Sequence, residues 1–131
     1  MNLMLFRGLA SRLLLSKRKV KEEPPAVISA TEPTAITAAD SGNTYSLDSE
    51  TARIVLPYSG TLTTGWTIKV QCTVVNKDIR CAGGDLGLGV IMMGSEQFDG
   101  LILGSLGATV LLEFDGYFLA SISGTVTGYW D

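Results

Sequence analysis

The residues able to support chemistry are few, because the 131-residue chain contains no histidine. It therefore lacks the commonest general base, the usual metal ligand and the Ser-His and Cys-His nucleophile arrangements. Its two thiols, Cys72 and Cys81, cannot complete a closed four-ligand zinc site within one chain. We expect no catalytic residue, no metal site and no cofactor.

Two other patterns resemble catalytic or nucleotide-binding motifs. The carboxylates of Asp99, Glu113 and Asp115 could pair for acid–base work, as in glycoside hydrolysis, but nothing in their spacing fixes a pair across a cleft. The glycine-rich stretch Gly83–Gly89 has no following lysine and serine, and no helix to donate amides to a phosphate. Turn and bulge glycines explain it better.

The charges are divided unevenly along the chain. Residues 1–21 hold six of the ten basic residues and no acid, a charge of +6. From Glu22 onward four basic residues face thirteen acidic ones, a charge of −9. An acidic body repels nucleic acid and anionic lipid, so an anionic partner would have to bind residues 1–21 alone. We expect neither a nucleic acid nor a membrane as the partner.

The opening segment fits no standard targeting signal well. A secretory signal carries its charge before an apolar core, whereas Arg7 and Arg12 interrupt this one and the charge cluster follows it. Its apolar run is shorter than the roughly 20 residues that span a bilayer. A mitochondrial transit peptide fits better, since the segment is Arg-rich, contains serine and lacks acids.

We favour a different interpretation, in which residues 1–25 form an anchoring arm that docks on a larger assembly. A helix over 3–15 would be moderately amphipathic, because Met4 and Leu15 would lie on its polar side with Gly8, Ser11 and Arg12. Its apolar face would be formed by Leu3, Phe6, Leu9, Ala10 and Leu13. The candidate anchoring residues are Leu3, Phe6, Arg7, Leu9, Arg12, Leu13, Lys17, Arg18 and Lys19.

After this arm, prolines at 24, 25 and 33 predict an extended linker over 26–35. From Ile36 onward the chain consists of short apolar segments separated by glycine, with no credible helix. The clearest is Trp66–Val75, which places Trp66 and every second residue after it on one face. Trp66, Trp130 and the tyrosines could stack on sugars or bases, but one aromatic residue per strand is more typical of a core.

Two turns punctuate this β-rich part. Asp115-Gly116 lies between two strand-like segments, Ala108–Phe114 and Tyr117–Ile122, and predicts a hairpin. Asn76-Lys77 could form another two-residue turn, which would place Cys72 opposite Cys81 in a possible disulfide. Two small buried thiols are the favoured alternative.

The sequence thus predicts an all-β domain over 36–131, a small antiparallel sandwich or barrel-like domain. Its apolar content exceeds what so small a domain must bury, so part of it should pack between subunits. The residues expected at that interface are Met92, Met93, Leu101 and Leu103.

Several sequence segments resemble small β modules of tailed-phage virion proteins. The stretch Ile36–Asp48 is similar to their opening phrase, and Ile54–Pro57 is similar to the strand ending in Leu-Pro that follows it. The segment Ala108–Phe118, followed by Ser123–Val126, is similar to their closing hairpin. The resemblance covers 36–131, with a weakly matched middle from 76 to 106, and does not include the arm.

This resemblance implies a non-enzymatic structural role on a phage particle, assembled in the bacterial host cytoplasm. The leading expectation is a capsid decoration or head-fibre subunit, often a homotrimer, that binds the major capsid protein or another virion protein. A tail fibre, adaptor or baseplate component is the alternative. A further alternative is a peripheral membrane protein whose basic arm lies on anionic lipid.

Overall fold

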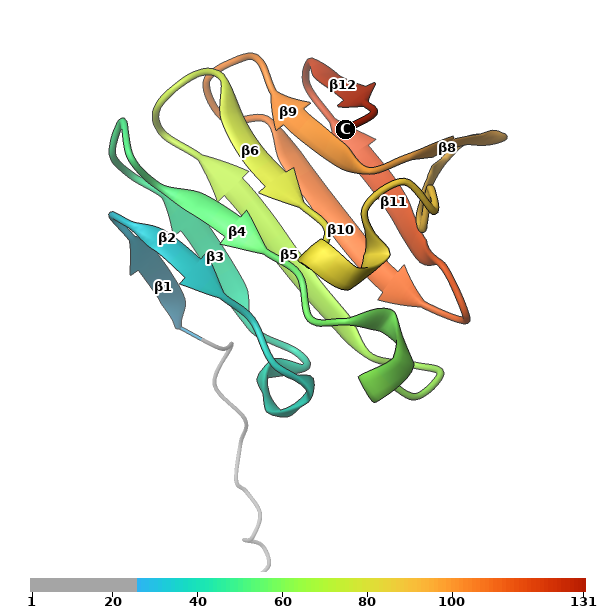
Figure 1. The fold of residues 1–131 in the computed structure, drawn as a ribbon. Coiled ribbons are helices and arrows are strands. Elements are labelled where there is room, and N and C mark those ends of the chain that lie inside the picture. The colour runs from blue at the N-terminus through green and yellow to red at the C-terminus, as the bar shows by residue number, and fades with distance from the viewer. Residues whose placement is uncertain (1–25) are drawn as a thin grey trace, which may run out of the picture.

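The structure is a computed structural model that describes residues 26–131, and they form two β-sheets packed face to face (Figure 1). The strands of the seven-stranded sheet, in spatial order, are β1 (Val27–Ala30), β3 (Thr44–Leu47), β5 (Thr67–Cys72), β10 (Thr109–Phe114), β11 (Phe118–Ser123), β7 (Ile91–Met93) and β8 (Glu96–Phe98). Those of the five-stranded sheet are β12 (Val126–Tyr129), β9 (Gly100–Leu103), β6 (Lys77–Arg80), β4 (Arg53–Val55) and β2 (Pro33–Ala35). The all-β prediction is confirmed.

The first six strands alternate between the two sheets, so the chain winds around the core (Figure 1). β1, β3 and β5 pair in parallel in one sheet, and β2, β4 and β6 do the same in the other. Each strand of one sheet therefore serves as the crossover connection that parallel neighbours in the other sheet require. The expectation of an antiparallel sandwich is wrong for this half, and both sheets are mixed.

The segment 26–35 is part of the β-domain and not a linker. β1 pairs with β3 over Val27–Ala30, and β2 pairs with β4 over Pro33–Ala35. Proline favours extended backbone, as expected, and Pro33 stands at the start of an edge strand, where a missing N–H is tolerated. The extended conformation was predictable from proline, whereas the pairing partners lie far along the chain.

The predicted turn at Asn76 exists but connects different strands from those expected. Asn76 has a φ of 62°, the left-handed conformation that asparagine tolerates. The turn carries the chain from β5 in one sheet to β6 in the other. Each of these strands already pairs on both edges, so they form no hairpin. Cys72 and Cys81 therefore do not face each other, and both are free and buried.

The predicted Asp115-Gly116 hairpin is confirmed. β10 and β11 pair antiparallel from Thr109 with Ser123 to Phe114 with Phe118. Gly116 has a φ of 113°, which a residue with a side chain rarely adopts. This hairpin supplies the aromatic centre of the core, where Phe118 contacts Phe114 and the edge of Trp66.

The core lies between the sheets and includes residues that were predicted to lie at an interface between subunits. Leu101 and Leu103 on β9 are fully buried, so they cannot contact another subunit. Met93 is half-buried and packs against the same core. The alternation of β5 is as predicted, with Ile68, Val70 and Cys72 inside.

Helical structure among residues 26–131 is confined to three-residue 3-10 turns. These are η1 (Ala38–Asp40), η2 (Ser59–Thr61) and η3 (Gly83–Asp85). No helix in this described part is long and apolar enough to cross a membrane.

Candidate functional site

The candidate anchoring residues, Leu3 to Lys19, lie outside the described residues, so their role stays a prediction. The remaining candidates can be placed. Within residues 26–131, no group of three or more Cys, Asp or Glu side chains is arranged to hold a metal ion.

The two thiols are held in their protonated form. Burial raises the pKa of Cys81 to about 12, and the nearby carboxylates of Asp85 and Asp99 act in the same direction. Burial also raises the pKa of Cys72, whose sulfur donates to the carbonyl of Ser105 at 3.2 Å. Because the thiolate is the reactive form, neither cysteine has the character of a nucleophile.

The three candidate acid–base carboxylates lie in different environments. Asp99 is fully buried and accepts hydrogen bonds from the backbone N–H groups of Gly89 at 3.1 Å and Asp131 at 2.9 Å. Glu113 is exposed on β10, and Asp115 is in the hairpin turn. The structure therefore brings no two of them together across a cleft.

The glycine-rich stretch Gly83–Gly89 packs against side chains of the segment Tyr58-Ser59. Asp85 is buried, and its carboxylate accepts from both the backbone N–H of Ser59 at 2.8 Å and the hydroxyl of Ser59 at 3.0 Å. This contact joins η2 to η3. Gly84 packs against the ring of Tyr58, which also covers Gly60. The glycine-rich stretch therefore begins with η3 and packs against the segment around η2.

One surface of the seven-stranded sheet exposes apolar side chains away from the core. We call it the outer face and define it by Lys69, Leu111, Glu113 and Leu119. Leu111 is 43 % exposed and Leu119 is 36 % exposed, although both lie in central strands. Met92 continues the same row, because it pairs with Leu119 and is half-buried.

Opposite charges flank the leucines of the outer face. Lys69 pairs with Leu111, and Glu113 pairs with Leu119. Neither Lys69 nor Glu113 forms an ion pair with another residue of 26–131. A depression of about 180 Å³ lies beside Leu111, lined in part by Thr44 and Lys69. The outer face thus offers an apolar projection, a depression and both charges.

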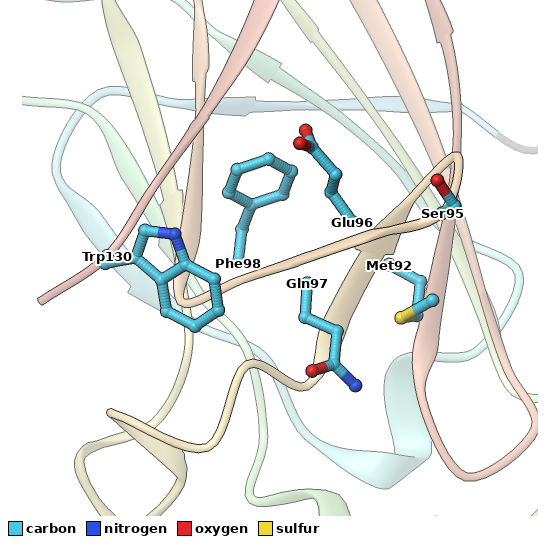
Figure 2. Close-up of a pocket in the computed structure, with 6 residues that line it drawn as sticks. All are labelled: Met92, Ser95, Glu96, Gln97, Phe98 and Trp130. Atoms are coloured by element: carbon cyan, nitrogen blue, oxygen red, sulfur yellow. The ribbon is translucent and has the colours of Figure 1, made fainter.

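A second surface feature is a hollow of about 280 Å³ at the free edge of the same sheet (Figure 2). Its lining residues come from the β7–β8 hairpin and from the segment that follows β12. They are Met92, Ser95, Glu96, Gln97, Phe98 and Trp130. Trp130 is 59 % exposed, so this tryptophan is not a core residue, whereas Trp66 is.

Neither family models nor curated proteins offer a guide to these two surfaces. No protein-family model matches the chain, and no curated protein matches it.

Of the outer face, the sequence indicated Met92 as an interface residue but did not indicate Leu111 or Leu119. Alternation along a strand separates two faces but does not say which face another layer covers. Leu111 and Leu112 are equally apolar, yet Leu112 is fully buried and Leu111 is not. A usable signal was present in the polar residues beside Leu111 and Leu119, since Lys69 and Glu113 are poor core residues.

Proposed function

We propose that this protein is a non-enzymatic structural subunit of a phage particle, acting as a capsid decoration or head-fibre protein. The β-domain would associate with further copies, most simply as a trimer, and residues 1–25 would dock on the shell. The observation that supports this proposal is that the chain divides into a basic, apolar segment and an acidic β-domain with an apolar outer face.

A second copy of the chain is the occupant proposed for the outer face. Leu111 and Leu119 would lose their contact with water there, which is the main driving force for association. Around a threefold axis Lys69 of one copy would meet Glu113 of the next, because a ring of three copies is closed by head-to-tail contacts between different parts of the patch. The depression beside Leu111 would receive an apolar side chain of the neighbouring copy.

The proposed docking depends on charge and on multiple attachment. The arm carries +6, so it would bind acidic patches of the shell, with its apolar residues in grooves. Several weak arms on one oligomer bind much more tightly than a single arm. The resemblance of 36–131 to virion modules supports the same assignment.

Deleting residues 1–21 tests whether the arm docks on the shell while the β-domain alone forms the oligomer. The truncated chain should keep the number of subunits in the oligomer of the full chain but should no longer co-sediment with purified particles. The full chain is the control in the same sedimentation experiment. A truncated chain that still co-sediments with particles would show that the arm is not the docking element.

A further inference from the structure

The hollow beside β7 and β8 contains the exposed indole of Trp130. Hydrogen bonds of the two flanking residues, Tyr129 and Asp131, hold Trp130 in place. The backbone N–H of Asp131 donates to the buried carboxylate of Asp99 at 2.9 Å, and the Asp131 carboxylate pairs with Arg80 at 2.7 Å. On the other side of Trp130, the carbonyl of Tyr129 accepts from the N–H of Asp99 at 2.8 Å. Trp130 is thus fixed at both flanking residues.

Packing further restricts the indole itself. Its six-membered ring lies against Gly89, where an added Cβ would come within 3.0 Å of a ring carbon. The same Cβ would lie 2.9 Å from Cβ of Gln97, so Trp130 and Gln97 are neighbours around this glycine. The ring of Phe98 is 6.0 Å away at an interplanar angle of 45°, too tilted to cover the indole face. A ring held in this way loses little conformational entropy when a ligand stacks on it.

Polar side chains of the β7–β8 hairpin lie to one side of the indole. The side chains of Ser95, Glu96 and Gln97 line the hollow, and no hydrogen bond within residues 26–131 occupies them. Together they offer the hydroxyl of Ser95, the two carboxylate oxygens of Glu96 as acceptors, and the amide of Gln97, which both donates and accepts. Figure 2 shows Glu96 and Gln97 on opposite sides of β8, with Trp130 alongside.

We propose that this hollow binds a neutral hexopyranose unit of a glycan, stacked on Trp130. A pyranose ring has one face of C–H groups, which complements the negative π-face of an indole. Its hydroxyls both donate and accept, which matches the mixture of amide, carboxylate and hydroxyl at the rim. The volume of about 280 Å³ suits a single small ring and not an extended ligand.

The charges distinguish this ligand from two others that stack on tryptophan. A nucleotide would bring its phosphate against Glu96 and against a domain of charge −9 from residue 22 onward. A quaternary ammonium ion prefers a cage of several aromatic faces, whereas Phe98 packs on Gly128 and leaves Trp130 as the one widely exposed ring of the hollow. A neutral sugar meets neither objection.

Saturation-transfer NMR on the full chain tests this proposal. The probes are methyl β-D-galactopyranoside, methyl β-D-glucopyranoside and N-acetyl-D-glucosamine, each at about 10 mM because single-sugar sites commonly bind in the millimolar range. At least one probe should receive saturation at its ring C–H protons. Trp130→Ala should abolish the signal, and Gln97→Ala should weaken binding about two- to tenfold through the loss of one hydrogen bond.

The controls separate binding at this hollow from nonspecific contact. Tyr117→Ala removes an exposed aromatic ring in the β10–β11 turn, outside the hollow, and should leave the signal unchanged. Circular dichroism verifies that each variant is folded, and Trp130→Leu, which also lacks a ring, replaces Trp130→Ala if the latter unfolds. Choline at the same concentration probes the cationic alternative. No transfer to any of the three sugars, an unchanged signal in the ring-less Trp130 variant, or stronger saturation of choline than of the sugars would each overturn the proposal.

Discussion

Three aspartates act inside the domain as hydrogen-bond acceptors that join distant segments. Asp48 accepts from the hydroxyls of Ser29, Ser46 and Thr73, and these hydrogen bonds lower its pKa from the ordinary value of 3.8. Asp85 and Asp99 accept from backbone groups of other loops. Part of the acidic charge of this domain is therefore structural, because these carboxylates hold together segments that are far apart in sequence.

The thiols support a prediction about chemical reactivity. Because burial keeps both sulfurs protonated, neither cysteine should react with an aromatic disulfide reagent at pH 8 in the folded chain. Both should react after unfolding in urea without a reductant, which a colorimetric thiol titration measures. Rapid reaction of the folded chain, or fewer than two thiols after unfolding, would contradict the buried, free state.

The same burial predicts how stability depends on pH. The pKa of Cys81 is about 12 in the folded chain against an ordinary 9.0, so between these values the folded state holds a proton that the unfolded state has lost. The free energy of unfolding therefore falls as pH rises through this window. Urea titrations at pH 8 and pH 10 should show the lower midpoint at pH 10, and Cys81→Ala should reduce the difference. A midpoint that rises would contradict this sign.

Among the elements, the edge strand β12 is held on the five-stranded sheet by the ring of Tyr129, which lies over Gly100. Tyr129 pairs with Gly100 across β12 and β9, and its ring covers the glycine so closely that no Cβ fits. The Tyr129 hydroxyl donates to Asp78 on β6, which also pairs with Arg53 on β4 at 3.0 Å. One side chain thus ties the last strand to the middle of the sheet.

Gly100→Ala tests this closure. The added methyl group must displace the Tyr129 ring, so we expect a loss of about 1–3 kcal/mol in the free energy of unfolding. Gly83→Ala is the matched control, since its Cβ would meet no atom within 4 Å and its φ is not positive. Urea unfolding compares the two variants. Equal midpoints for both would contradict the packing of Tyr129 on Gly100.

Several elements were predictable from sequence because their signals are local. Alternation identified β5, and an Asp-Gly pair identified the β10–β11 hairpin. The pairing of β1 with β3 and of β2 with β4 was not predictable, because each pair is joined by a crossover through a strand of the other sheet and not by one tight turn. The hollow escaped prediction too, since it assembles Trp130 with a hairpin more than 30 residues earlier.

The whole molecule is proposed to associate with further copies through the outer face. Exchanging its charges tests this directly. Lys69→Glu or Glu113→Lys alone should weaken self-association, because each creates repulsion between like charges across the contact. The double variant should restore it, since the pair is complementary again. Sedimentation velocity measures the oligomeric mass of each chain.

A surface variant outside that face provides the control for the charge exchange. Leu106→Glu adds a charge at a residue that is 70 % exposed in the loop between β9 and β10. It should leave the oligomeric mass unchanged. An unaltered mass in both single variants of the outer face would show that copies do not meet there.

If the chain is a structural component of a phage particle, as proposed, it must be present in purified particles. Quantitative mass spectrometry of particles purified from the lysate of its source by density gradient measures this. The chain should band with the particles at a fixed ratio to the major capsid protein. Recovery of the chain only from the soluble fraction, with none in the particle band, would contradict the proposal.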